Sequence, residues 1–396
     1  KGFTDAWELR KLSELGEINT GSTPSTSNPD YYSENGIPWV TPTDINALTI
    51  IDTPRKLSEK GAKVGRIVPA NTILCTCIAS IGKNTLLTVK GSFNQQINSL
   101  TPNKENDPYF LLTESALWSE KMKQMASSGT MQIVNKKEFS ELKTMVSTFE
   151  EQRQIGTYFR TLDHLITLHQ RKCETLQKLK KSMLQKMFPK NGSCFPEIRF
   201  AGFTDAWELR KLGDGLLLLK DGTHGTHKNS DKGVYLLSAK NIKNGEVIID
   251  DKADRKISFS EYENIHSTFT LKKDDVLLTI VGSIGEVAIL KNPDIMTFQR
   301  SVAFLRPKDF LTPSFLKTEI ESDTFQKELS DRKSQSAQPG VYLGELEKIP
   351  FYIPKLSEQR QIGTYFRTLD HLITLHQRKL ETLKKLKKAM LQKMFI

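Results

Sequence analysis

An internal repeat constrains this chain more than any other feature of its sequence. Gly2–Leu12 reads GFTDAWELRKL, and Gly202–Leu212 reads the same eleven residues. Glu151–Phe188 and Glu358–Phe395 are identical at 35 of 38 positions. The stretches that separate these blocks are similar in length but differ strongly in sequence. A repeat of this size predicts one structural plan built twice, with a variable and a constant part in each copy.

The longer repeated block is predicted to form a helix that pairs with another helix. Each copy has no internal proline and a single glycine, and its apolar positions follow the heptad spacing of paired helices. Ordinary globular helices mostly span roughly 8–20 residues, so a single amphipathic helix on a core is the less favoured alternative. The expected pairing positions are Phe159, Leu162, Ile166, His169, Cys173 and Leu176 in the first copy, and Phe366, Leu369, Ile373, His376, Leu380 and Leu383 in the second.

Polar residues interrupt this seam in both copies. Lys180 and Lys387 stand at seam positions, and the neighbouring Leu179 and Leu386 are expected to replace them there. The two seam histidines are expected to fix the helix register, with a metal or catalytic role as the alternative.

The variable stretches are predicted to be mixed α/β domains. Strand-like runs occur at 37–40, 72–78, 86–89, 234–238, 247–249, 276–281 and 287–290, and helix-like stretches that open on proline occur at 108–125 and 313–329. Ser80-Ile81-Gly82 in the first copy resembles Ser283-Ile284-Gly285 in the second. The predicted division is 1–148, 149–190, 191–355 and 356–396, with an α+β fold class and a pseudo-two-fold tandem repeat.

Composition places the chain among ordinary globular proteins. It has 396 residues, 37% hydrophobic and 26% charged, which argues against a disordered or fibrous chain. No uninterrupted run of 18 apolar residues exists, so no membrane association is expected. The four cysteines lack the spacing of a zinc site and are too few for a disulfide scaffold, which predicts a reduced, intracellular protein. Because Lys1 rather than Met comes first, the sequence is expected to start inside a longer reading frame.

Positive charge is concentrated in the repeated helical blocks. The net charge is +11, and residues 151–190 and 358–396 each hold nine basic and three acidic residues. The remainder of the chain is therefore near neutral. Basic proteins attract polyanions, usually nucleic acid, although a charged helix face exposed to water explains the same pattern.

Known catalytic signatures are missing from the sequence. Gly213-Asp214-Gly215 is followed by leucines rather than completing a nucleotide-binding G-x-G-x-x-G, and Gly82-Lys83 lacks the upstream glycine of a phosphate-binding loop. Motifs for amino-methylation or for a nuclease are also absent. His224 and His227 in a glycine-rich loop leave a metal site open as an alternative, but two ligands are few. No catalytic and no metal-binding residue is predicted.

Short polar loops recur in both variable stretches at corresponding places. Hydroxyl, amide and guanidinium side chains on loops suit hydrogen bonding to base edges in a DNA groove, although single polar loops are common on any surface. The predicted DNA-contacting residues are Thr23, Thr41, Thr43, Ser80, Lys83, Gln95, Gln96, Ser128 and Thr130 in the first stretch, and Thr223, His224, Lys240, Asn241, Ser283, Gln299, Arg300, Ser334 and Gln335 in the second.

These motifs together resemble the specificity subunit of Type I restriction–modification systems, over nearly the whole chain. They are the twice-present GFTDAWELRKL, the segments 37–40 and 80–82, and the EQRQIGTYF that opens each long helix. A strand with a proline, Ile353-Pro354-Lys355-Leu356, precedes the second helix, whereas Thr148-Phe149-Glu150 has no proline, which leaves the start of the first helix open.

The resemblance implies a division of labour between subunits. Each variable domain is expected to be a target recognition domain that reads one half of a split double-stranded DNA sequence, and the two helices to pair antiparallel as a spacer. Two methyltransferase subunits are expected to dock on the repeated regions, restriction subunits to join them, and S-adenosylmethionine, ATP and Mg²⁺ to bind those partners in the cytoplasm. Two identical surfaces agree with one partner bound twice about a pseudo-two-fold axis.

Two other functional classes stay open from the sequence. A coiled-coil adaptor with two protein-binding heads would show the same repeats without binding DNA. A restriction–methylation enzyme in one chain is disfavoured by the missing motifs.

Overall fold

The computed structural model describes residues 6–127, 133–190, 192–334 and 339–395. The chain divides into two compact units. Unit 1 comprises Lys1–His169 with Lys379–Ile396, and unit 2 comprises Gln170–Arg378. Both long helices, α5 (Phe149–Lys186) and α10 (Leu356–Met394), therefore contribute to both units.

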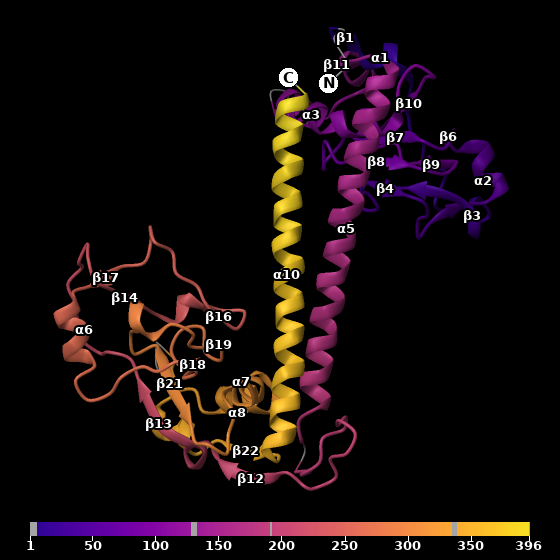
Figure 1. Ribbon diagram of the computed structural model, residues 1–396. Helices are drawn as coiled ribbons and strands as arrows, with labels where there is room; N and C mark the ends of the chain where they lie inside the picture. Colours follow the sequence, from indigo (N-terminus) through magenta and orange to yellow (C-terminus); the bar gives the residue numbers. More distant parts are fainter. Residues whose placement is uncertain (1–5, 128–132, 191, 335–338, 396) are drawn as a thin grey trace. The chain divides into compact units, whose positions relative to one another are not determined.

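The described part of unit 1 contains three sheets, and its buried apolar residues form two clusters (Figure 1). An antiparallel pair joins β1 (Glu8–Lys11) to β11 (Lys143–Val146). The other sheets have the orders β2-β10-β7-β8-β4 and β5-β3-β9-β6. Their strands are β2 (Gly16–Thr20), β3 (Tyr32–Val40), β4 (Thr49–Ile50), β5 (Lys56–Leu57), β6 (Ile67–Val68), β7 (Thr72–Thr76), β8 (Asn84–Leu87), β9 (Gly91–Phe93) and β10 (Ile97–Pro102). The helices are α1 (Leu12–Leu15), α2 (Glu59–Val64), α3 (Pro108–Ser127) and α4 (Lys136–Glu141).

Unit 2 repeats this plan with different residues. The antiparallel pair is β12 (Glu208–Lys211) with β22 (Pro350–Ile353), and the larger sheets have the orders β13-β21-β18-β19 and β17-β14-β20. Their strands are β13 (Leu216–Asp221), β14 (Val234–Leu237), β17 (Lys256–Ile257), β18 (Val276–Thr279), β19 (Val287–Ile289), β20 (Met296–Phe298) and β21 (Val302–Pro307). A hairpin of β15 (Ile242–Lys243) and β16 (Glu246–Val247) completes the strands, and the shorter helices are α6 (Phe259–Ile265), α7 (Pro313–Glu321), α8 (Asp323–Asp331) and α9 (Leu343–Glu347).

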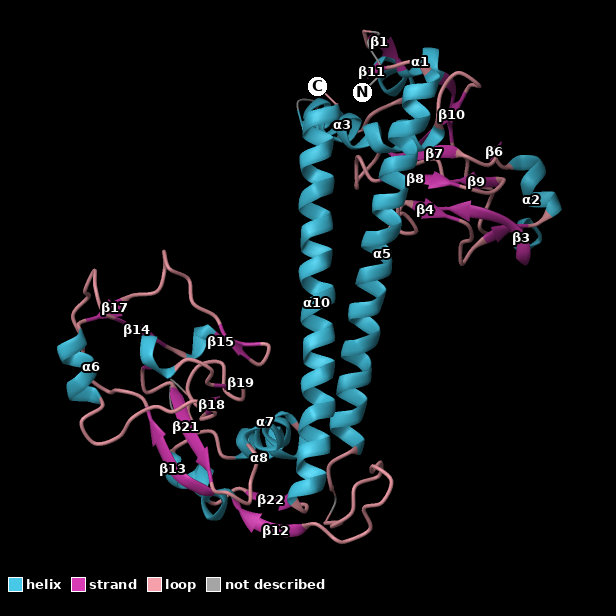
Figure 2. Ribbon diagram, in the orientation of Figure 1, coloured by secondary structure: helices cyan, strands magenta, loops and turns pink. Residues whose placement is uncertain are grey.

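The same strand pairings recur in the two units, which confirms the predicted repetition of one α/β plan. β3 pairs in parallel with β9 in unit 1, and β14 pairs in parallel with β20 in unit 2. The central antiparallel ladders β2-β10-β7 and β13-β21-β18 correspond likewise. Figure 2 colours the helices and strands of each unit by type.

Two details of the predicted elements are wrong. The helix expected over 313–329 is two helices, because Ser322 has an extended backbone and its hydroxyl caps Phe325 N of the second helix at 3.2 Å. The first-copy counterpart, α3, is continuous. The strand expected over 247–249 stops at Val247, because Ile248 N donates instead to Asn241 O of a neighbouring loop.

Within each unit the segments of α5 and α10 run antiparallel. In unit 1 Phe159 near the start of α5 packs on Phe395 after the end of α10, with ring centroids 5.8 Å apart. In unit 2 Phe188, after the end of α5, packs in the same way on Phe366 near the start of α10, at 6.2 Å. All twelve predicted pairing residues are buried or half-buried, as a heptad seam requires.

The lysines at seam positions lie on the pairing face of the helices, and the neighbouring leucines do not replace them there, contrary to the prediction. Leu179 and Leu386 are 39% and 38% exposed, whereas the side chains of Lys180 and Lys387 are 19% and 23% exposed. Each lysine is kept on the inner face by carboxylates, described below. Among the described residues, no helix is apolar over a long enough stretch to cross a membrane.

Candidate nucleic-acid interface

The polar loops of unit 1 meet at one place because neighbouring strands end there. Ser22 N donates to Phe93 O at 3.0 Å, and Asn94 N donates to Val40 O at 2.9 Å. Cys77 N donates to Gln96 O at 2.9 Å. These bonds join the loops after β2, β3, β7 and β9, which carry Thr23, Thr41, Thr43, Gln95 and Gln96. We call this set the unit 1 loop cluster.

Unit 2 forms a matching unit 2 loop cluster with the same backbone bonds. Thr223 N donates to Phe298 O at 2.9 Å, and Gln299 N donates to Leu237 O at 2.8 Å. Ile280 N donates to Ser301 O at 2.9 Å. Residues far apart in the sequence, Thr223, His224, Gln299 and Arg300, thereby gather at the ends of β13 and β20. The structure places Gln95 of unit 1 and Arg300 of unit 2 at equivalent exposed positions.

A cavity of about 290 Å³ opens within the unit 2 loop cluster. Its lining includes His224, Arg300, Ser334 and Tyr342. The Tyr342 ring is 69% exposed, and the His224 side chain is 63% exposed. A guanidinium, an imidazole and an aromatic ring around one hollow offer both hydrogen bonding and stacking to nucleobases.

The two loop histidines have separate partners. His224 Nε2 lies 2.6 Å from Asp221 Oδ2, whereas His227 Nε2 lies 2.7 Å from Thr223 Oγ1 and its Nδ1 lies 3.3 Å from Glu261 Oε1. Among the described residues, no group of three or more His, Cys, Asp or Glu side chains is placed to hold a metal ion.

Asn241 is placed differently from the other predicted DNA contacts. It is 4% exposed, and its amide donates to Asp254 and to Ile248 O and accepts from Ser238 N. A side chain with its hydrogen-bonding groups occupied inside the domain shapes the loop, so the structure does not present it to a base. The neighbouring Lys240 is exposed and forms an ion pair with Asp254 at 2.8 Å.

The repeated Ser-Ile-Gly motif forms the same tight turn in both units. Thr76 Oγ1 accepts from Lys83 N at 2.9 Å and donates to Ser80 O, and Thr279 does the same with Glu286 N and Ser283 O. Gly82 and Gly285 have φ of 84° and 100°, a left-handed conformation that favours glycine. The motif therefore recurs because the turn requires it, while a base contact from Ser80, Lys83 or Ser283 stays a prediction. Ser128, Thr130 and Gln335 lie outside the described residues.

Comparison with known proteins decides the family. The model of the Type I restriction modification DNA specificity domain matches residues 4–178 and 204–385. This chain belongs to that family. The two matches coincide with the two copies of the fold, so it is a tandem specificity-domain protein.

Individual relatives agree over most of the chain. The Type I restriction enzyme MjaVIII specificity subunit of Methanocaldococcus jannaschii is 26% identical over 338 residues, covering 82% of this chain and 78% of the relative. The putative MjaX specificity subunit of the same organism is 23% identical over 416 residues, covering 97% and 92%. The crystal structure of the S subunit from M. genitalium has a TM-score of 0.68 at 16% identity, covering 100% of this chain and 98% of that one, which shows a shared fold.

A pair of buried glutamines joins the repeated helices of this specificity-domain protein to its variable domains. Gln152 Oε1 accepts from Asp107 N at 3.0 Å, and its Nε2 donates to Ser147 O at 2.8 Å. Gln359 Oε1 accepts from Thr312 N at 2.9 Å, and its Nε2 donates to Pro354 O at 2.9 Å. We call Gln152 and Gln359 the clamp glutamines. The EQRQ motif signalled them, although the sequence alone did not show what they bind.

Each clamp is followed by a glycine that permits close packing. A Cβ on Gly156 would lie 2.3 Å from Asp107 Oδ1, and a Cβ on Gly363 would lie 2.3 Å from Ser314 Oγ. The start of each long helix is therefore packed directly on the first turn of α3 or α7. The repeated block fixes the orientation of the recognition domain in its own unit.

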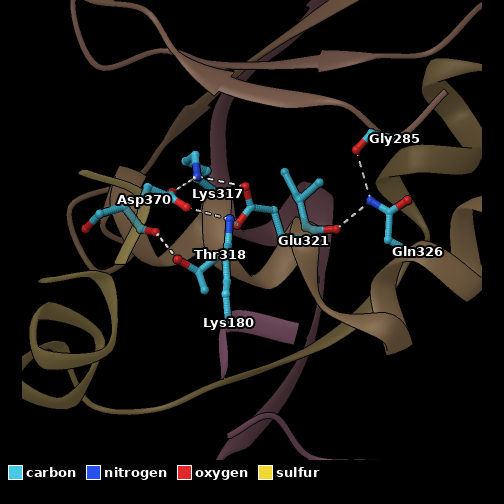
Figure 3. Close-up of polar contacts among 9 residues, drawn as sticks. Lys180, Gly285, Lys317, Thr318, Glu321, Gln326 and Asp370 are labelled. Carbon is cyan, nitrogen blue, oxygen red and sulfur yellow. Dashed lines mark hydrogen bonds and ion pairs between the residues drawn. The ribbon is translucent and has the colours of Figure 1, made fainter. Parts of the chain in front are cut away.

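A network of ion pairs in unit 2 ties α5, α7 and α10 together (Figure 3). Lys180 Nζ lies 2.7 Å from Asp370 and 2.9 Å from Glu321, and Lys317 Nζ lies 2.8 Å from each of the same carboxylates. Burial alone would lower the pKa of Lys317, but Glu321 and Asp370 outweigh it and raise that pKa above its usual value. In unit 1 the equivalent lysine, Lys387, lies 2.5 Å from Asp163, which also accepts from the Tyr109 hydroxyl at 3.1 Å.

Exposed apolar side chains recur at equivalent positions of the repeats. Leu168 and Leu375 are 53% and 52% exposed, and Leu9 and Leu209 are 58% and 57% exposed. Phe159, a predicted pairing residue, is not part of this surface, because it is fully buried against Phe395. Single exposed apolar side chains are common on protein surfaces, so what distinguishes these four leucines is their recurrence at equivalent positions of the repeats.

Proposed function

We propose that this chain is the DNA-reading, non-catalytic specificity subunit of a Type I restriction–modification complex. Unit 1 reads one half of a split duplex target and unit 2 reads the other. The observation that carries this proposal is the presence of one loop cluster in each unit, built on the same backbone bonds but with different side chains. Two domains that each recognise a different half-site need the same backbone arrangement of loops but different polar side chains on them.

The repeated surfaces are proposed to hold two methyltransferase subunits, through which restriction subunits join. Leu168 with Leu375 and Leu9 with Leu209 offer the same chemistry twice, which suits two copies of one partner. S-adenosylmethionine, ATP and Mg²⁺ are proposed to bind those partners, and the cytoplasm is the proposed location. Lysine and arginine contacts to phosphates would supply salt-dependent affinity, and the loop clusters the base preference.

The test is methylation mapping of DNA from cells with and without this gene, in the presence of the methyltransferase. A split motif whose methylation requires the gene is the expected result. Binding of the purified complex to duplex DNA should also weaken steeply with salt. Salt-independent or undetectable DNA binding would favour the coiled-coil adaptor, and methyl transfer by the chain alone would favour an enzyme.

A matched pair of variants tests the assignment of half-sites. Arg300→Ala should relax base preference in the second half of the target only, because a bidentate arginine contributes about 1–3 kcal/mol of discrimination. Gln95→Ala, at the equivalent position of unit 1, should relax the first half only. Relaxation of both halves by either variant would contradict independent reading.

A further inference from the structure

A tyrosine of unit 1 and a serine of unit 2 stand at equivalent positions beside the repeated helices. Tyr109 and Ser314 each lie two residues after the residue whose backbone N–H binds the clamp glutamine of the same unit. The Thr113 hydroxyl donates to Tyr109 O at 2.8 Å. In unit 2 the Thr318 hydroxyl donates to Ser314 O at the same distance. The two positions therefore share their local backbone arrangement and differ in the side chain.

In unit 1 two residues of the repeated block hold the Tyr109 ring. The Tyr109 hydroxyl donates to Asp163 Oδ2 at 3.1 Å. The Arg160 guanidinium lies over the ring, 4.9 Å from its centroid. Tyr109 is 4% exposed, so these contacts are made inside the unit. A guanidinium on the ring face and a carboxylate at the hydroxyl are both favourable partners for a phenol.

Unit 2 keeps the two holding residues but has no ring between them. The repeated block is identical here, so Arg367 and Asp370 are the equivalents of the residues that hold Tyr109. Because a serine replaces the tyrosine, a cavity of about 280 Å³ opens beside α10. Its lining includes Ser314, Thr318, Gly363, Arg367 and Asp370. A cavity of about 150 Å³ can hold benzene, so this one has room for a substituted ring.

The lining also offers a donor and an acceptor at one place. Lys317, which lines the cavity, has its Nζ 2.8 Å from Asp370 Oδ2 and 2.8 Å from Glu321 Oε1 (Figure 3). An ammonium group has three N–H donors, and these two carboxylates use two of them. A hydroxyl on a ring in the cavity can accept from Lys317 and donate to Asp370, as Tyr109 donates to its aspartate in unit 1.

The charges of the lining favour a neutral ring over an anion. Lys317 is balanced by Asp370 and Glu321. Lys291, another lining residue, is paired with Glu246 at 3.2 Å. An anion would have to compete with these carboxylates, whereas a neutral phenol leaves both ion pairs in place.

We propose that this cavity of unit 2 is a binding site for a phenol ring. Arg367 covers the ring face, and the ring hydroxyl bonds to Asp370 and Lys317. The site shares no lining residue with the cavity of the unit 2 loop cluster, as far as the described residues show. It therefore goes beyond the reading of DNA and does not depend on it. The phenol is a free small molecule or the tyrosine side chain of another polypeptide, and the experiment separates these two sources.

The experiment titrates the full chain with p-cresol, which has the ring and hydroxyl of tyrosine. Calorimetry should show one p-cresol bound per chain, with a dissociation constant on the order of 1 mM or tighter. Ser314→Tyr places a ring in the cavity covalently, so this variant should lose p-cresol binding and unfold at a higher temperature. Arg367→Ala should weaken binding about two- to fivefold through loss of the cation–π contact. Arg160→Ala, the equivalent change in unit 1, is the control and should leave binding unchanged.

A capped Gly-Tyr-Gly peptide is the second probe. Binding of both probes supports the site and identifies the ring as a tyrosine side chain, whereas binding of p-cresol alone supports the site and identifies a free phenol. Failure of the full chain to bind p-cresol would overturn the proposal, as would binding that Ser314→Tyr leaves unchanged. If Ser314→Tyr does not fold, the arginine pair decides, and an equal effect of Arg367→Ala and Arg160→Ala would overturn the proposal.

Discussion

The two units hold the repeated helices by the same contacts but present different side chains to the exterior. The clamp glutamines have the same type of backbone partners in both units. At the loop clusters, by contrast, Gln95 stands where unit 2 has Arg300, and Lys83 stands where it has Glu286. Residues that position a domain on the long helices are constrained by buried hydrogen bonds, whereas residues on the loop clusters are free to differ.

The ion pairs of the long helices α5 and α10 show a second kind of difference. Unit 1 balances Lys387 with Asp163, whose carboxylate also accepts from the Tyr109 hydroxyl. Unit 2 adds Lys317 and Glu321 from α7, so that two lysines face two carboxylates. The repeated helices are therefore identical at these positions, while each recognition domain completes the network in its own way.

The largest expected effect comes from exchanging one recognition domain. Replacing residues 13–147 with the corresponding domain of another family member should change one half of the methylated target completely and leave the other half unchanged. Exchange of 213–355 is the matched control and should change the other half. If methylation mapping showed both halves of the target altered by a single exchange, the two units would not read their half-sites independently.

The second effect concerns two buried glutamates at equivalent places. Burial raises the pKa of Glu114, on α3, and of Glu319, on α7, from 4.5 to about 8. Between about pH 4.5 and pH 8, each glutamate is ionised in the unfolded chain but protonated in the folded chain. The free energy of unfolding therefore falls as pH rises through this range. Replacing either glutamate by glutamine should remove this pH dependence. The free energy of unfolding should then be higher by up to about 3 kcal/mol at pH 7 and unchanged below about pH 4.

Denaturant unfolding at pH 4 and pH 7 checks this prediction and compares the units. Glu114→Gln should give the larger gain, because the Thr144 hydroxyl already donates to this side chain at 2.8 Å. Glu319→Gln should gain less, since Glu319 Oε2 has no partner among the described residues. An unchanged pH dependence in both variants would show that the glutamates are ionised in the folded protein.

A smaller effect is expected from the clamp glutamines. Gln152→Ala and Gln359→Ala should each destabilise their own unit by about 2 kcal/mol, because a buried backbone N–H and carbonyl lose their partner. Hydrogen exchange should show faster exchange at the start of α3 for the first variant and at the start of α7 for the second. Arg153→Ala, an exposed neighbour on α5, is the control and should have little effect. If both variants destabilised the same unit, the two clamp glutamines would not have equivalent roles.

The smallest effect separates the two ion-pair networks. Asp163→Asn should destabilise unit 1 by about 1 kcal/mol, because Lys387 loses its carboxylate but its partly exposed ammonium can still reach water. Asp370→Asn should cost less, since Glu321 still pairs with both Lys180 and Lys317. The thermal unfolding midpoints of the two variants show which substitution destabilises the protein more. A larger decrease for Asp370→Asn than for Asp163→Asn would contradict this prediction.

The sequence by itself determined the architecture at the level of blocks. Two copies of an eleven-residue and a long helical block, with heptad spacing in the latter, required two similar domains joined to paired helices. Strands with strong apolar runs, such as β7 and β18, were also predicted correctly, because their burial on both faces leaves a clear pattern. The family followed from the same repeated motifs.

Only the tertiary structure decided how the polar residues are used. Lys180 and Lys387 stay on the inner face because carboxylates distant in sequence balance them, a contact that no heptad pattern contains. Asn241 looked like a base contact on a polar loop, but Asp254 and Ile248 hold it inside the domain. Spacing along the chain predicts which face a residue occupies, whereas the partner that satisfies a buried polar group is set by long-range packing.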